Sequence, residues 1–266
     1  MERNPREAPV GVFDSGVGGL TIWHELVRLL PAEHTIYLAD SANAPYGGKS
    51  PGAILELARK NTRWLLERGC KLIVVACNTA TTNAIDRLRA EFPVPFIGIE
   101  PAIKPAALNS RSGKIGVLAT RGTLSSSLFA STSRNFGSGI EIVEQEGVDL
   151  VERIESAGPD DPELRDILER LLKPMLLQGI DYLVLGCTHY PLLKPTLEHL
   201  LPEGVRILDC GLPVARQSRA ILEREGLLRD AGGPVRHELL TNGDPGVMRQ
   251  VLLQLGHKQV PRREAF

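Results

Sequence analysis

The sequence predicts an α/β fold of two pseudo-symmetric domains, each with a mostly parallel sheet flanked by helices, and with an active site in the cleft between them. Short β-branched runs alternate with amphipathic stretches along most of the 266 residues, which is the pattern of a parallel sheet covered by helices. Two strands end alike, in a cysteine followed by small polar residues and a helix: Cys77 and Cys187. Their separation, 187 minus 77 or 110 residues, is the size of a small domain and indicates duplication.

Nine runs are predicted to be strands, and several are apolar enough to be covered on both faces. They are residues 9–16, 35–40, 71–78, 94–100, 114–120, 139–145, 181–188, 205–211 and 237–243. Between the second and third runs, "SPGAILELARKNTRWLLERG" predicts a helix with Ser50 as N-cap, Pro51 in the first position and Gly69 at its exit.

The predicted first domain combines residues 1–100 with 211–266, and the second spans 101–210. "EPAIKPAALNSRSG" is the best candidate for the first crossover, and a second crossing is expected near "DCGLPVARQ". The final segment, "HKQVPRREAF", carries no recognisable motif, and we expect it to be a frayed tail.

Composition narrows the functional classes. With 31 Lys+Arg against 32 Asp+Glu, the chain offers no general field for nucleic acid or an anionic membrane. It has no run near the roughly 18 apolar residues of a membrane helix, and "MERNPREAPV" lacks the apolar core of a signal peptide. We therefore expect a soluble, cytoplasmic protein whose four cysteines are free thiols, with Cys70 and Cys210 packed as buried hydrophobes.

Polar residues gather where the first two strands end. "GVFDSGVGGL" fails the dinucleotide pattern because Thr21 stands where a third glycine is needed, and no lysine follows as in a Walker loop. Asp14 and Ser15 are left at the strand end, either as helix caps or as site residues. "ADSANAPYGGKS" is a loop with Asn43 and Tyr46 as polar tips, either a surface turn or part of the site.

The two cysteine segments carry the strongest chemical signal. "CNTATT" opens a helix, and free amides at a helix start favour an anion, including a thiolate from a cysteine whose reference pKa is about 8.5. "GCTHYP" repeats the arrangement with Thr188 and His189. A histidine two residues from a strand-end cysteine is either structural or tunes that thiol.

"GVFDSGVGGL", "APYGGKS", "CNTATT" and "GCTHYP", in this order, resemble the glutamate racemases of the cofactor-independent amino-acid racemase superfamily, over residues 10 to about 215. The resemblance implies two bases on opposite faces of the α-carbon, with Cys77 deprotonating D-glutamate and Cys187 deprotonating L-glutamate. Asp14 and His189 would assist the respective thiols. An auxiliary acid is implied upstream of the second cysteine, at Glu155 or its neighbour Glu152.

The resemblance also implies the substrate contacts, which are Asp14, Ser15, Tyr46, Gly47, Asn78, Thr79, Thr188 and His189. It implies no cofactor and no metal, a homodimer, and supply of D-glutamate for peptidoglycan. Lys49 and Lys194 lie in turn-like segments without a Schiff-base context. Ser41 and Asn43 replace the threonine and arginine of many members, which leaves the contacts of this loop open.

Three other functional classes are compatible with parts of the sequence. An aspartate racemase or a thiol-dependent decarboxylase of the same superfamily is one; the decarboxylases typically lack one of the two cysteines. A non-catalytic binder of small acids is another, although paired strand-end thiols would serve no purpose in it. A zinc site from Cys77, Cys187 and His189 lacks the close ligand spacing of structural zinc sites. Regulation by a cell-wall precursor and the extent of domain closure are not determined by the sequence.

Overall fold

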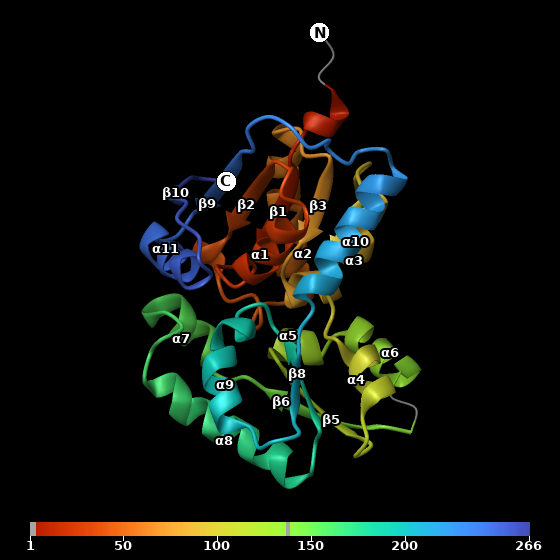
Figure 1. Ribbon diagram of the computed structural model, residues 1–266, viewed down its shortest axis with the longest axis vertical. Coiled ribbons are helices and arrows are strands. Elements are labelled where there is room, and N and C mark those ends of the chain that lie inside the picture. The colour runs from red at the N-terminus through yellow and green to blue at the C-terminus, as the bar shows by residue number, and fades with distance from the viewer. Residues whose placement is uncertain (1–3, 137–138) are drawn as a thin grey trace.

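The computed structural model describes residues 4–136 and 139–266 and contains two parallel sheets. The six-stranded sheet has the order β10-β9-β2-β1-β3-β4, with β1 (Val10–Asp14), β2 (Thr35–Ala39), β3 (Leu72–Val75), β4 (Phe96–Gly98), β9 (His237–Thr241) and β10 (Arg262–Arg263). The four-stranded sheet has the order β6-β5-β7-β8, with β5 (Lys114–Ala119), β6 (Glu141–Glu146), β7 (Tyr182–Gly186) and β8 (Arg206–Leu208). All nine predicted strands are confirmed. We call the six-stranded sheet with its helices the first lobe and the four-stranded sheet with its helices the second lobe; Figure 1 shows the first lobe above the second.

The first four strands of each lobe follow one topology. The order β2-β1-β3-β4 in the first lobe matches β6-β5-β7-β8 in the second. Cys77 follows β3 and Cys187 follows β7, so each cysteine comes after the corresponding third strand of its lobe. The duplication predicted from the two cysteine segments therefore appears in the strand order itself.

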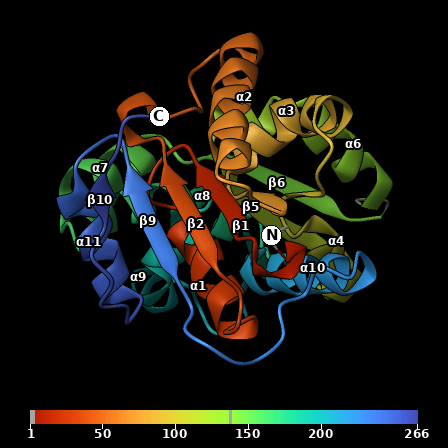
Figure 2. The same ribbon diagram turned by 90° about the horizontal axis from the view of Figure 1, so that it is seen from above.

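Helices cover both faces of the first sheet. α1 (Leu20–Leu29) and α10 (Gly211–Arg224) pack together on one face, and α2 (Pro51–Glu67) and α3 (Asn78–Glu91) on the other (Figure 2). The predicted helix start is confirmed in α2, where the Ser50 side chain accepts a hydrogen bond from the Ala53 amide at 3.3 Å. The remaining helices are α4 (Ile103–Asn109), α5 (Arg121–Leu124), α6 (Ser127–Phe136), α7 (Leu150–Ala157), α8 (Glu163–Leu177), α9 (Lys194–Leu200) and α11 (Pro245–Gln254), with short 3-10 turns at Pro5–Glu7, Ser41–Asn43 and Tyr190–Leu193.

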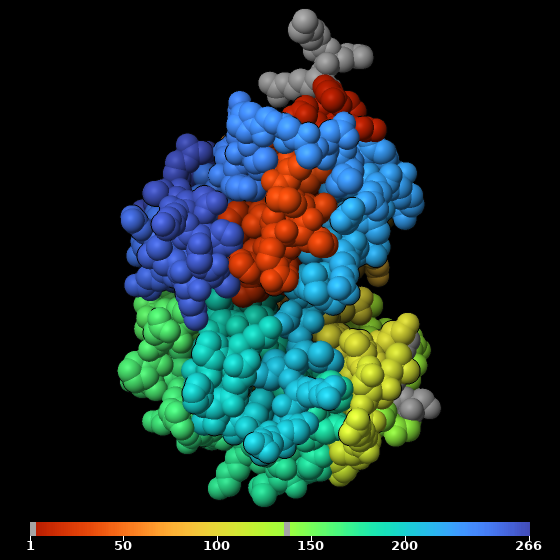
Figure 3. Space-filling view, in the orientation of Figure 1, coloured from red at the N-terminus to blue at the C-terminus, as the bar shows by residue number. Residues whose placement is uncertain are grey.

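Strand side chains alternate between separate cores, as a period of two requires. Leu72 and Val74 of β3 join the core under α1, whereas Ile73 and Val75 join the core under α2 and α3. The core under α1 continues through Leu118 into the second lobe, so one apolar cluster crosses both lobes. The two lobes meet across the middle of the molecule on the face shown in Figure 3.

The expectation of a frayed C-terminal tail is wrong. Arg262 and Arg263 form β10, which pairs in parallel with β9, and the Phe266 ring packs edge-on against Trp64 with centroids 5.6 Å apart. This edge strand has no apolar run to reveal it, because both of its residues are exposed arginines. None of the helices in the described parts of the chain has the length and apolar character needed to cross a bilayer.

Candidate functional site

A small cavity lies where the strand ends of the two lobes meet. Its lining comprises Ser15, Pro45, Tyr46, Gly47, Cys77, Asn78, Thr79, Thr120, Val151, Gly186, Cys187, Thr188 and His189. The centre of a water molecule can reach only about 10 Å³ of it, which is room for roughly one water. The two lobes therefore lie close together at the site, and both cysteines line one narrow space from opposite lobes.

Most of the predicted site residues line this cavity, and the other two lie directly behind it. Asp14 is fully buried and contacts Ser15 and Thr188, while Glu155 contacts His189. Glu152 is exposed, so the structure places Glu155 rather than Glu152 beside the histidine.

Cys77 lies at the start of α3 and is its N-cap. Its Sγ accepts a hydrogen bond from the Ala80 amide at 3.4 Å and lies 3.6 Å from Ser15 Oγ, to which the thiol donates. Burial and the nearby Asp14 carboxylate raise the pKa of the Cys77 thiol well above its usual value, outweighing the Ala80 contact. Burial and Asp14 therefore oppose the thiolate that the start of α3 favours.

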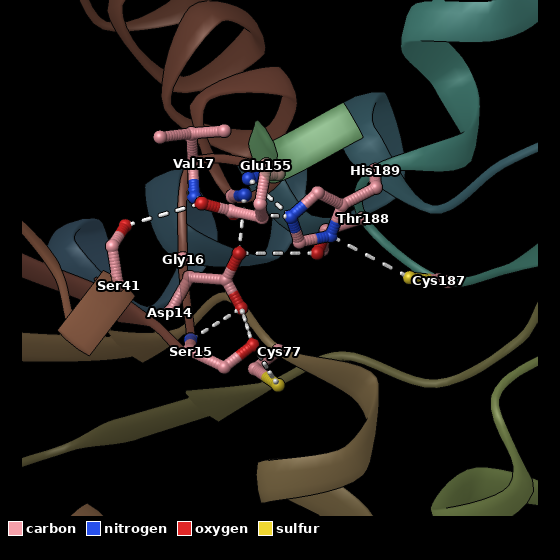
Figure 4. A network of polar contacts seen from close by, with 12 residues as sticks. Asp14, Ser15, Gly16, Val17, Ser41, Cys77, Glu155, Cys187, Thr188 and His189 are labelled. Atoms are coloured by element: carbon pink, nitrogen blue, oxygen red, sulfur yellow. Dashed lines mark hydrogen bonds and ion pairs between the residues drawn. The ribbon is translucent and has the colours of Figure 1, made fainter. Parts of the chain in front are cut away.

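Asp14 joins the two lobes at the end of β1. Its Oδ1 accepts from the Ser15 amide at 2.7 Å, and its Oδ2 accepts from the Gly19 amide at 2.6 Å and from Thr188 Oγ1 at 3.2 Å (Figure 4). Burial raises the pKa of Asp14, although the nearby His189 opposes the shift. Asp14 thus caps the turn before α1 and also contacts Thr188 of the cavity wall. The two predicted roles, helix cap and site residue, are compatible.

Cys187, His189 and Glu155 form a chain of contacts. Cys187 Sγ lies 3.7 Å from His189 Nδ1, and His189 Nε2 lies 2.6 Å from Glu155 Oε1 (Figure 4). Burial alone would lower the pKa of His189, but its interactions with Cys187 and Glu155 raise that pKa well above the usual value. This arrangement can hold an imidazolium between a thiol and a carboxylate.

The tautomer of His189 follows from two competing contacts at Nε2. The Gly18 amide also points at Nε2, at 3.2 Å, which would require an unprotonated nitrogen. The contact to Glu155 is shorter, and a carboxylate oxygen can only accept. We therefore assign a hydrogen to Nε2, which leaves Nδ1 to exchange a proton with Cys187.

Two glycines permit the second lobe to reach the first. A Cβ on Gly16 would lie 1.9 Å from Glu155 Oε1, and a Cβ on Gly18 would lie 2.3 Å from His189 Nδ1. Neither glycine has a positive φ, so the requirement is close approach rather than backbone conformation. The sequence showed a glycine-rich turn, but its purpose depends on residues more than 130 positions away.

Asn78 is the most conspicuous polar group of the lining. It is 2% exposed, and neither its Oδ1 nor its Nδ2 has a hydrogen-bond partner. A buried amide left unpaired costs about 1–3 kcal/mol, so its place on the cavity wall favours a polar ligand. Its neighbour Thr79 bonds across the lobes, with Oγ1 2.8 Å from Thr120 Oγ1.

Of the two alternatives for the loop that carries Tyr46, a surface turn or part of the site, the structure favours the second, because Tyr46 lines the cavity. It is 1% exposed, and its hydroxyl donates to Asp40 Oδ2 at 2.5 Å. Burial and Asp40 raise the pKa of Tyr46 far above its usual value. Asp40 and Thr120 were not singled out from the sequence, because Asp40 bonds Asn242 and Thr120 bonds Thr79, partners distant in the chain.

Lys49, Lys194, Cys70 and Cys210 are not among the residues that line the cavity. Lys194 begins α9 rather than occupying a turn, and it forms an ion pair with Asp209. Cys70 and Cys210 are buried as predicted, and burial raises the pKa of each thiol to about 12. Within residues 4–136 and 139–266, three or more histidine, cysteine or acidic side chains do not come together in a way that could hold a metal ion.

Comparison with known proteins identifies close relatives. The family described as Asp/Glu/Hydantoin racemase matches residues 10–217. A protein named glutamate racemase from Stutzerimonas stutzeri is 48% identical over 246 residues, 92% of each chain. Among solved structures, a glutamate racemase isoform from Bacillus anthracis superposes with a TM-score of 0.88 at 30% identity over 98% of both chains. The Escherichia coli glutamate racemase, solved in complex with L-glutamate and the activator UDP-MurNAc-ala, has a TM-score of 0.86 at 36% identity, covering 97% of this chain and 98% of that one.

Proposed function

This chain belongs to the Asp/Glu/Hydantoin racemase family, and from that premise we propose that it is a glutamate racemase that interconverts L- and D-glutamate. The observation that carries the proposal is the pair of thiols, Cys77 and Cys187, facing one closed cavity from two lobes of matching topology. Relatives that carry the name glutamate racemase and match nearly the whole chain support the substrate.

The reaction moves one proton from one face of the α-carbon to the other. One cysteine, as a thiolate, removes the α-proton and leaves a carbanion whose charge spreads into the carboxylate. The opposite cysteine, as a thiol, then donates its proton to the other face. Cys77 acts as base on D-glutamate and Cys187 on L-glutamate, and after each turnover the two protonation states are exchanged.

Each thiol has a route for its own proton. The Cys77 thiol donates to Ser15, whose hydroxyl donates to Asp14 Oδ1 at 3.3 Å. Cys187 contacts His189, which donates to Glu155. Because the pKa of the Cys77 thiol is raised in the closed protein, transfer of its proton toward Asp14 is the step that prepares it as a base.

The substrate is held by polar groups of the lining. The unpaired Asn78 amide supports a role in binding a glutamate carboxylate, together with backbone amides at the start of α3. The full proposed set is Asp14, Ser15, Tyr46, Gly47, Asn78, Thr79, Thr188 and His189; the Tyr46 hydroxyl already bonds Asp40, so Tyr46 contributes its ring or backbone. Because the cavity holds about one water, the lobes must separate for glutamate to enter.

The wider setting of the reaction is part of the same proposal and rests on the resemblance to glutamate racemases. We place the protein in the cytoplasm as a homodimer that supplies D-glutamate for peptidoglycan. The domain limits 1–100 plus 211–266 and 101–210 are supported by the strands, because β1 to β4, β9 and β10 lie in the first set and β5 to β8 in the second.

Racemisation in deuterated water tests the proposal. Wild type, without added cofactor, should invert each glutamate enantiomer and incorporate α-deuterium, whereas aspartate should react far more slowly. Cys77→Ser and Cys187→Ser should each lower turnover by more than about a thousandfold, because an alcohol is a far weaker acid than a thiol. Cys70→Ser, a substitution of a buried thiol outside the cavity, is the matched control. Turnover that survives in both site variants, or that depends on pyridoxal phosphate, would exclude the two-thiol mechanism.

A further inference from the structure

We infer that Asp40 and Asn242 are positioning residues that fix the shape of loop 41–47 and thereby hold one wall of the cavity closed over Cys77. The predicted change in KM rests on the proposed function. The predicted fixing of the loop and the protection of Cys77 rest on the hydrogen bonds alone. Neither residue lines the cavity, so both would act through the loop and not on the substrate.

Asp40 is a buried carboxylate surrounded by neutral donors. It is 0% exposed at the end of β2. Its Oδ1 accepts from Asn43 Nδ2 at 2.7 Å and from Asn242 Nδ2 at 2.5 Å, while Oδ2 accepts from the Tyr46 hydroxyl. Three donors require acceptors on both oxygens, which a carboxylate provides and an amide does not.

Asn242, the residue directly after β9, completes the anchor. Its Nδ2 donates to Asp40, and its Oδ1 accepts from the Ala42 amide at 2.9 Å. Gly243 lets this contact form, because a Cβ there would lie 2.6 Å from the Ser41 Cβ. The loop is therefore bound through one backbone amide and two side chains, Asn43 and Tyr46.

The anchored loop touches the second lobe at both of its ends. Ser41 Oγ lies 3.3 Å from Glu155 Oε2, and Figure 4 shows this contact beside the His189 chain. At the other end, a Cβ on Gly47 would lie 3.2 Å from Thr120 Cβ, so the backbone of the loop fits closely against the second lobe. Between these ends, Pro45, Tyr46 and Gly47 line the cavity, and Tyr46 shares a buried cluster with Cys77.

A residue that positions the loop and a residue that only stabilises the fold predict different effects on substitution. A loop that is free to move would bind glutamate less tightly and would expose the Cys77 thiol. A residue that only stabilises the first lobe would lower the melting temperature but would leave the KM and the exposure of Cys77 in the folded protein unchanged.

The experiment compares Asp40→Asn with Asp181→Asn in the full chain. Asp181 is a matched control, because its carboxylate likewise fixes a turn, accepting from Ser110 Oγ at 2.7 Å and from the Ser112 amide at 3.0 Å, and it does not line the cavity. We expect Asp40→Asn to raise the KM for both enantiomers about tenfold and to change kcat less than about threefold. Asp181→Asn should leave both constants near wild type.

Alkylation provides a readout that does not need activity. Iodoacetamide labelling, resolved by peptide mass spectrometry, should modify Cys77 at least fivefold faster in Asp40→Asn than in wild type, with Cys70 unchanged as an internal control. Asn242→Ala should reproduce both effects more weakly, and melting temperatures establish that each variant is folded. If Asp40→Asn is unfolded, Asn242→Ala decides the outcome by the same two measurements.

The two proposals fail in different ways. A wild type that does not racemise glutamate would reject the proposed function, and the labelling rates would still decide the loop inference. A racemase whose Asp40→Asn and Asn242→Ala variants keep a wild-type KM and a wild-type Cys77 labelling rate would overturn the loop inference alone.

Discussion

Cys77 and Cys187 occupy equivalent positions in the two lobes, yet their surroundings differ in chemistry. Each follows the third strand of the strand order that the two lobes share. The local backbone differs, because Cys77 is the N-cap of α3, whereas Cys187 leads into a turn and the 3-10 segment Tyr190–Leu193 instead of the helix expected there. Cys77 reaches a carboxylate through a hydroxyl, in the chain Cys77–Ser15–Asp14. Cys187 reaches a carboxylate through an imidazole, in the chain Cys187–His189–Glu155.

The difference shows that matching strand order places the two thiols, whereas residues outside that shared pattern supply their proton partners. Burial and the Asp14 carboxylate raise the pKa of the Cys77 thiol, whereas the contacts of His189 with Cys187 and Glu155 raise the pKa of that imidazole against the effect of its burial. Thiols on opposite sides of the cavity suit a reaction that runs in both directions. Proton abstraction by Cys77 and proton abstraction by Cys187 can nevertheless have different activation barriers. Three experiments measure how far the two sides differ.

The largest expected effect comes from removing one proton partner at a time. His189→Asn and Asp14→Asn should each lower kcat/KM by about 10²–10⁴-fold, the usual contribution of general acid–base catalysis. Each loss must be equal in the two directions, because the enantiomers have the same free energy. The isotope effects should differ: His189→Asn should increase the α-deuterium effect for L-glutamate, and Asp14→Asn should increase it for D-glutamate.

His199→Asn, an exposed histidine of α9, is the control and should keep wild-type kinetics. Equal isotope effects for both enantiomers in both variants would contradict the assignment of one partner to each thiol.

A smaller loss of kcat/KM is expected for a substitution at Gly18, the glycine against which His189 packs. Gly18→Ala would place a Cβ 2.3 Å from His189 Nδ1 and push the imidazole away from Cys187. We expect kcat/KM to fall about 10–100-fold, with an isotope pattern that follows His189→Asn. Gly48→Ala meets no atom within 4 Å and should be neutral. Steady-state kinetics of the two folded variants provide the comparison, and a fully active Gly18→Ala would show that the close approach is dispensable.

The smallest effect concerns stability at alkaline pH. The folded pKa of Cys77 is raised, so its contribution to stability is complete below the unfolded pKa of about 8.5 and is lost as pH rises toward the folded value. Cys77→Ser should therefore flatten the fall in unfolding free energy above pH 8.5, by up to about 1.4 kcal/mol per pH unit. Ser15→Ala removes a neighbour that does not titrate and should keep the wild-type slope. Urea unfolding between pH 8 and 10 measures both, and equal slopes for wild type and Cys77→Ser would contradict the raised pKa.

Sequence patterns predicted best those features that depend on residues close together in the chain. The strands were recognisable from short apolar runs, and the α2 start from Ser50 and Pro51, because these depend on near neighbours. The thiols at Cys77 and Cys187 stood out because each ends a strand. β10 was missed because two exposed arginines carry no strand signal. Tyr46 lines the cavity, but the sequence did not indicate that its hydroxyl donates to Asp40.

The sequence by itself determined the α/β class, the duplicated cysteine segments and the family, since all three are written in local patterns of residues. Only the tertiary structure decided that Gly16 and Gly18 make room for Glu155 and His189, that burial raises the pKa of the Cys77 thiol, and that Asp40 bonds Asn43, Tyr46 and Asn242. The physical reason is that close approach, burial and hydrogen-bond partnership are properties of residues far apart in the chain. They exist only after the two lobes have folded against each other.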